Sequence, residues 1–123
     1  MKTMRRNGVD TEYELTTAAA NAGPMRLEFV QPNFGDMVYQ SHIDRFGFGG
    51  VQHLGIAVEN MEESLEIVRR TGITIAMEGA GYGLDGDGHY AYLDTEHLLG
   101  ITEELVPPEE TKGTYQNLSH VAT

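Results

Sequence analysis

The chain has 123 residues, no cysteine, and a formal net charge of −11 from 19 acidic and 8 basic residues. This length suits one domain with a modest core, to which a dimer interface would add burial. The lack of cysteine excludes disulfides, thiolate nucleophiles and cysteine-based zinc sites. The acidic balance argues against a nucleic-acid partner, because phosphate binding needs clustered lysine and arginine.

The sequence predicts no association with membranes. It has no run of about eighteen apolar residues, and the basic residues near its start are not followed by an apolar stretch. We therefore expect a cytoplasmic protein without a signal peptide. The negative charge would attract a cationic small molecule, although acidic residues that only aid solubility would give the same composition.

In the first half of the chain, alternating apolar residues predict strands over residues 11–18 and 25–31. Residues 21–24, Asn-Ala-Gly-Pro, form a turn-prone cluster between them. Residues 36–46 favour a short helix. The first half is thus expected to be a hairpin followed by a helical connection.

Residues 49–73 predict a strand followed by a helix. His53 shares its strand face only with the small Gly55 and Ala57, which is typical of a strand that lines a cavity. Asn60 is a good N-cap with Glu63 three residues later, and Gly72 ends the helical pattern.

Strands are then expected at 73–77, 89–94 and 100–106, with a glycine-rich loop after the first. The loop sequence GYGLDG formally matches a dinucleotide-binding pattern. We reject that function, because a predicted strand follows the glycines where phosphate binding needs a helix N-terminus.

Three residues on predicted strands, Glu28, His53 and Glu104, are candidate metal ligands. Imidazole and carboxylate together suit a divalent ion such as zinc, nickel, cobalt, manganese or iron. Taken alone, they are more typical of a buried histidine with two acidic residues on exposed strand faces. Tyr90 and Tyr92 share one strand face, where they would contact a substrate or simply pack in the core.

The segments MRLEFVQP, GGVQHLGIAV and AYLDT…LGITEELV follow one another in the order found in the vicinal oxygen chelate superfamily, which the chain resembles. This group includes glyoxalase I, methylmalonyl-CoA epimerase and the bleomycin-resistance proteins. The resemblance implies an α+β fold of βαβββ modules that form a cupped mixed sheet or half-barrel, completed in a homodimer. It implies one domain over 1–123, with a first-module remnant at 11–32, a complete second module at 49–108 and a tail at 109–123.

The resemblance also implies that Glu28, His53 and Glu104 point into the barrel as metal ligands. Glu103 is a rival to Glu104, but counting four residues from Gly100 selects Glu104, and strand alternation turns Glu103 away. The first module lacks its opening strand and helix, which supply a metal-binding histidine in the family. The tail segment 118–122 resembles that opening, so His120 would replace the missing ligand if the tail adds as a strand; otherwise the tail is frayed.

The implied function is a metal-dependent isomerase, epimerase or lyase that acts on a small carbonyl or acyl-thioester substrate through an enolate-like intermediate. Glu28 and Glu104 are then the candidate catalytic carboxylates. The alternative is a metal-free protein that binds a small molecule, of the bleomycin-resistance type; the acidic charge and the tyrosines favour it, and the retained His53 and Glu104 oppose it. A third interpretation is a module without a catalytic role, so the sequence leaves open whether the chain is an enzyme.

Overall fold

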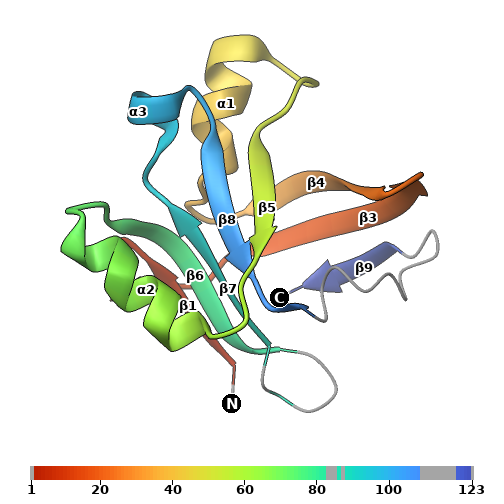
Figure 1. Ribbon diagram of the computed structural model, residues 1–123. Helices are drawn as coiled ribbons and strands as arrows, with labels where there is room; N and C mark the ends of the chain where they lie inside the picture. The colour runs from red at the N-terminus through yellow and green to blue at the C-terminus, as the bar shows by residue number, and fades with distance from the viewer. Residues whose placement is uncertain (1, 83–85, 87, 109–118, 123) are drawn as a thin grey trace.

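Figure 1 shows the computed structural model, which describes residues 2–82, 86 and 88–108, together with the backbone of residues 119–122. The elements are β1 (Thr3–Arg6), β2 (Val9–Asp10), β3 (Glu14–Ala22), β4 (Met25–Phe34), α1 (Tyr39–Phe46), β5 (His53–Ala57), α2 (Met61–Arg70), β6 (Ile75–Tyr82), β7 (Gly88–Leu93), α3 (Glu96–Leu99), β8 (Thr102–Val106) and β9 (Ser119–Ala122). The strands form a six-stranded sheet and a three-stranded sheet. Together with the helices, these sheets confirm the predicted α+β class.

The larger sheet has the strand order β2-β1-β6-β7-β8-β5. Strand β5 runs parallel to β8, while the other neighbours in the sheet are antiparallel. Helix α2 covers one face, where Leu65 is buried against Ala91, Leu93 and Leu105. The segment from β5 to β8 therefore has the element order β-α-β-β-β, with the short helix α3 before β8.

Helix α2 begins and ends where its capping residues predict. The Asn60 side chain accepts a hydrogen bond of 3.0 Å from the backbone N–H of Glu63. Beyond the last turn, Gly72 has a φ of 87°, a backbone conformation that glycine adopts at little cost. This helix fixes the outer face of the module and leaves the other face for the site.

The smaller sheet has the order β4-β3-β9. Pairing of β3 with β4 continues to Ala22 and Met25, so the turn is confined to Gly23 and Pro24 rather than spread over 21–24. Strand β9 pairs antiparallel with β3, with Thr17 opposite His120. The tail strand thus lies on the edge of β3 that faces away from β4.

The hairpin formed by β1 and β2 has no counterpart in the sequence prediction. Its turn residues Asn7 and Gly8 have φ values of 54° and 79°, the positive values that a tight two-residue hairpin requires. Strand β1 then pairs with β6 through contacts such as Arg6 opposite Met77. Residues 3–10 therefore extend the larger sheet instead of leading directly into the hairpin of β3 and β4.

The core between the two sheets holds them in a fixed relation. Its buried residues come from β3, α1, the segments before those elements, and the inner face of the larger sheet: Tyr13, Leu15, Met37, Val38, Tyr39, Ala76, Met77 and Tyr92. Helix α1 is shorter than the predicted 36–46, yet Met37 and Val38 before it are still buried. This core brings β4 towards β5 and β8.

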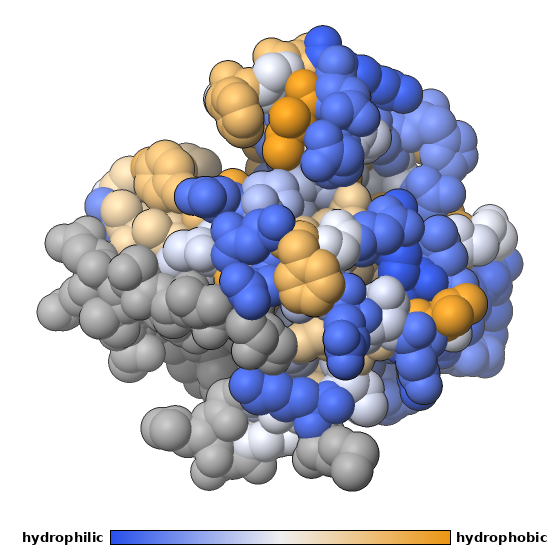
Figure 2. Space-filling model, turned by 180° about the vertical axis from the view of Figure 1, so that it is seen from behind, coloured by the Kyte–Doolittle hydropathy of each residue, from blue (hydrophilic) through white to orange (hydrophobic). Residues whose placement is uncertain are grey.

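Large apolar side chains remain exposed on the smaller sheet. On β4, Met25, Leu27 and Phe29 are 60%, 40% and 59% exposed. Seen from behind, apolar side chains also reach the surface at the end of the molecule where Figure 1 places α1 (Figure 2). No helix in the described part of the chain is long and apolar enough to cross a membrane.

Candidate functional site

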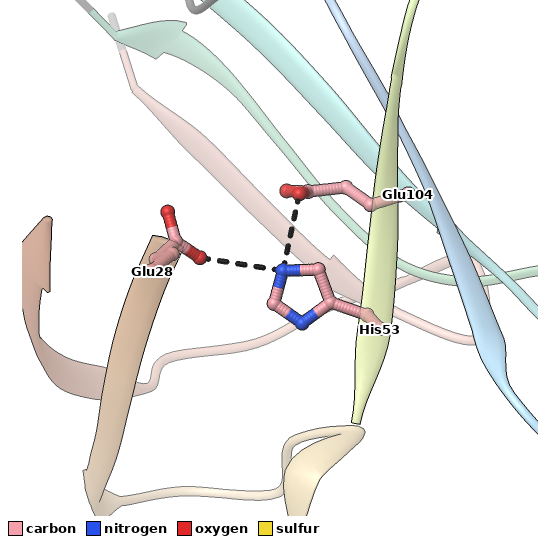
Figure 3. Close-up of side chains that lie close together, drawn as sticks. All are labelled: Glu28, His53 and Glu104. Carbon is pink, nitrogen blue, oxygen red and sulfur yellow. Dashed lines mark ion pairs between the residues drawn. The ribbon is translucent and has the colours of Figure 1, made fainter. Parts of the chain in front are cut away.

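Glu28, His53 and Glu104 point toward one another (Figure 3). The Nε2 atom of His53 lies 3.4 Å from Oε1 of Glu28 and 3.5 Å from Oε1 of Glu104. One ligand atom from each residue lies within 4.8 Å of the other two. His53 and Glu104 belong to β5 and β8 of the larger sheet and Glu28 to β4 of the smaller one, so the group joins the two sheets.

The register of β5 and β8 explains why His53 and Glu104 meet. Gly55 lies opposite Glu104 across this parallel pair, and a Cβ at Gly55 would lie 3.7 Å from Oε1 of Glu104. A side chain at this position would therefore contact the carboxylate, and glycine has none. The side chains of His53 and Glu104 are 11% and 10% exposed, whereas that of Glu28 is 32% exposed, so Glu28 is the most accessible of the three.

The two carboxylates raise the pKa of His53. Burial by itself lowers this pKa, but the hydrogen bond to Glu28 and the negative charges of Glu104 and Glu28 outweigh it. The pKa of His53 therefore lies above its ordinary value of 6.5. In the absence of a metal ion, a protonated His53 is the cation that compensates two partly buried carboxylates.

The same atoms suit a divalent ion. Ligand atoms at about 2.0–2.2 Å from an ion are about 2.8–3.6 Å apart when they are neighbours in an octahedral or tetrahedral coordination shell, with the tetrahedral separations at the upper end. The two measured separations, 3.4 and 3.5 Å, have this size. One imidazole and two carboxylates form a donor set for zinc and other borderline or hard divalent ions.

The other ring nitrogen of His53 is also engaged. Its Nδ1 atom lies 2.7 Å from Oε1 of Gln52, the preceding residue. Sequence reasoning missed Gln52, because neighbouring residues in an extended segment are normally expected on opposite faces.

The chain also matches a known protein family. Residues 2–92 match the family model described as the Glyoxalase/Bleomycin resistance protein/Dioxygenase superfamily. The chain belongs to this superfamily. The match includes Glu28 and His53 and ends on β7, so the place of Glu104 rests on the geometry of β8. No curated protein sequence matches the chain.

Two buried tyrosines, Tyr39 and Tyr92, lie beside the site. The ring of Tyr92 packs edge-on against that of His53, with 5.2 Å between centroids. The Tyr39 hydroxyl donates a 2.7 Å hydrogen bond to the Tyr92 hydroxyl. Burial, followed by the charge of Glu104, raises the pKa of both tyrosines well above the ordinary value, so both phenols stay neutral.

Tyr90 lies further from the site. Its hydroxyl is hydrogen-bonded to that of Tyr13, and its ring packs against Tyr92 at 5.9 Å between centroids. Tyr92 itself is only 2% exposed. A substrate-binding role for Tyr90 and Tyr92 stays a prediction, and Tyr39, which the sequence assigned only to a helix, joins them in this part of the glyoxalase-like core.

Glu104, and not Glu103, belongs to the three-residue group with Glu28 and His53. The backbone N–H of Glu103 donates to the hydroxyl of Thr95 at 3.0 Å. The side chain of His120 lies outside the described part of the chain. Its backbone pairs with Thr17, on the edge of β3 opposite to the one that pairs with β4, and its role as a fourth ligand stays a prediction.

Proposed function

We propose that the chain binds one divalent ion through His53, Glu104 and Glu28 and acts as a metal-dependent isomerase, epimerase or lyase. Its substrate would be a small carbonyl compound or acyl thioester. The convergence of one imidazole nitrogen and two carboxylate oxygens from two sheets carries this proposal. Membership of the glyoxalase superfamily supports it.

A bound divalent ion would supply Lewis acidity, which stabilises negative charge on a substrate oxygen. His53 and Glu104 are the better placed to hold the ion, because their side chains are about nine-tenths buried. Glu28 is the more exposed carboxylate, so it is also the candidate base. Its carboxylate oxygen that does not hold the ion would take a proton from the carbon beside the substrate carbonyl and return it. The phenol of Tyr92 lines this site as a neutral group.

The metal content of purified variants tests the site. We expect His53→Ala to lose most of the ion bound by the wild-type chain, because it removes the central ligand. His97→Ala is the matched control, since the His97 side chain is 63% exposed and contacts Asp94 instead. Elemental analysis after dialysis measures the ratio of metal to protein, and circular dichroism checks folding. Full occupancy in a folded His53→Ala variant would contradict the proposal.

The reaction class is tested with a small acyl thioester in deuterated water. We expect the metal-loaded wild-type chain to exchange the proton next to the carbonyl for deuterium, because the proposed base returns a proton drawn from solvent. Glu28→Gln should bind metal more strongly than His53→Ala does and yet fail to catalyse the exchange. Equal exchange rates in Glu28→Gln and the wild type would remove Glu28 from the role of base.

The second candidate is a metal-free small-molecule binding protein of the bleomycin-resistance type. One observation favours it: His53 and the two carboxylates compensate one another as ion pairs without an added ion. The net charge of −11 would also attract a cationic ligand. Calorimetry with bleomycin as a cationic probe, beside titration with zinc and nickel, separates the two candidates.

We also propose that the chain assembles as a homodimer. In the described part of the chain, β4 is an edge strand of the smaller sheet, and Met25, Leu27 and Phe29 on it are exposed. Exposed edges and apolar faces are normally paired or covered, and a second copy of the chain would cover them.

A further inference from the structure

The hydrogen bond between His53 and Gln52 determines which nitrogen of the imidazole is free. A neutral imidazole carries one N–H, so a hydrogen donated from Nδ1 to the amide oxygen of Gln52 leaves a lone pair on Nε2. Nε2 is the atom that faces both Glu28 and Glu104. The ring can bind an ion between the two carboxylates only in this tautomer.

The backbone of Gln52 is tied to the same strand pair as the site. Its carbonyl accepts a 3.3 Å hydrogen bond from the backbone N–H of Thr102, at the start of β8. The segment that carries the Gln52 side chain is therefore held beside β8. The 2.7 Å contact between Oε1 of Gln52 and Nδ1 of His53 then fixes the orientation of the imidazole ring.

The amide nitrogen of Gln52 is buried and has no hydrogen-bond partner in the described part of the chain. Leaving a buried donor unpaired is unfavourable, because the group loses its hydrogen bonds to water. Reversing the amide would put this nitrogen against Nδ1, and the imidazole hydrogen would then occupy Nε2 and block the ion. The orientation that favours metal binding is thus kept with one donor unpaired.

We propose that Gln52 is a positioning residue that holds His53 in the Nδ1–H tautomer and directs Nε2 at an ion between Glu28 and Glu104. This inference rests on the proposed metal site. Groups that bind the second nitrogen of a metal-ligating histidine fix the tautomer and orientation of its ring, and their removal typically weakens metal binding about 10- to 100-fold. Gln52 would set the affinity of the site without touching the ion.

Two substitutions at one position test this role. Gln52→Met keeps the length of the side chain and removes the acceptor, whereas Gln52→Glu keeps an acceptor oxygen. Gln40→Met is the matched control, because Gln40 is exposed on α1 and its side-chain amide donates to Asp44, away from the site. The Kd values for zinc and nickel are measured at pH 8 by competition with a chromophoric chelator, and thermal unfolding checks each variant.

We expect about 10- to 100-fold weaker binding in Gln52→Met, binding within a few-fold of the wild type in Gln52→Glu, and no change in Gln40→Met. Long-range ¹⁵N NMR of the metal-free chain, recorded above the pKa of His53, should place the hydrogen on Nδ1 in the wild type and on both nitrogens in exchange in Gln52→Met. This readout distinguishes positioning from a general loss of stability.

Equal zinc and nickel affinities in the wild type and a folded Gln52→Met, with the same tautomer in both, would overturn the role of Gln52 and leave the metal site standing. If Gln52→Met does not fold, Gln52→Glu still decides: a loss of binding as large as that of His53→Ala would overturn the proposal. A wild-type chain that binds neither ion would overturn the metal site and this role together.

Discussion

The adjacent residues Glu103 and Glu104 point to opposite faces of β8. The side chain of Glu104 lies beside that of His53 on the neighbouring strand β5, while alternation along β8 turns Glu103 to the other face, and Glu103 is not part of the three-residue group. We predict that Glu104→Gln lowers metal affinity at least tenfold, because a neutral amide replaces an anionic ligand. Glu103→Gln should leave it unchanged, and isothermal titration with zinc measures both. Equal losses would indicate a general effect of charge instead of ligation.

The raised pKa of His53 makes the stability of the metal-free chain depend on pH. A histidine whose pKa is higher in the folded state stabilises the fold below its unfolded pKa of about 6.5, and this contribution is lost as the pH rises through the folded pKa. In the presence of a chelator, we predict that the free energy of unfolding falls between about pH 6 and pH 9 by more in the wild type than in His53→Gln. Urea unfolding at both pH values measures this difference.

A matching pH dependence in the wild type and in His53→Gln would contradict that prediction. Added metal should reverse the effect, since the ion replaces the proton on Nε2 and binds more tightly as the pH rises.

Residue identity and family resemblance predicted Glu28, His53 and Glu104, because each is a chemically distinctive side chain on a predicted strand. Gln52 and Tyr39 were not predicted as site residues. Their roles depend on a contact between adjacent side chains and on a hydrogen bond to Tyr92, 53 residues away. Such contacts follow from the packing of the two sheets and leave no periodic pattern in the sequence.

Among the elements, α2 and the module around it were predicted from local signals, since the cap at Asn60 and the apolar periodicity agree. Strand β6 reaches Tyr82, although the sequence pattern ends at Met77. It has partners on both sides, β1 and β7, and this long-range pairing extends it. The hairpin of β1 and β2 was missed because its Asn-Gly turn lies between short, charged strands.

The tail strand β9 gives a prediction at this scale. Removing residues 114–123 should lower the thermal stability, because β3 would lose the four backbone pairs that it forms with β9. The backbone of His120 lies two strands from β4, about 10 Å at ordinary strand spacing. His120→Ala separates the tail's contribution to the fold from a contribution to metal binding. It removes the imidazole but keeps most of the backbone pairing with β3.

Loss of metal in His120→Ala with little change in melting temperature would support His120 as a fourth ligand. Unchanged metal content would leave a site of three protein ligands. A truncated chain as stable as the full chain would contradict the contribution of β9 to the fold.

In the described part of the chain, one edge strand of each sheet, β5 of the larger and β4 of the smaller, carries exposed apolar side chains. We predict a homodimer at micromolar concentration, and Phe29→Lys should convert it to a monomer by placing a charge on the apolar side of β4. Ile67→Lys is the control, because Ile67 is similarly exposed, at 54%, but lies on α2. Sedimentation velocity measures the mass.

A monomeric wild-type chain, or equal dissociation by both lysine substitutions, would contradict a dimer formed through β4. The first result would also require another explanation for the apolar side chains of Leu54 and Ile56, which are 50% and 41% exposed on β5.

The tyrosines of the core also give the molecule an optical property. The chain has six tyrosines and no tryptophan, so phenols dominate its intrinsic ultraviolet emission. The rings of Tyr39 and Tyr92 lie 6.3 and 5.2 Å from the His53 ring. A coloured or paramagnetic ion such as cobalt or nickel beside His53 would quench the fluorescence of both tyrosines at these distances. Occupancy of the site can therefore be followed in unlabelled protein.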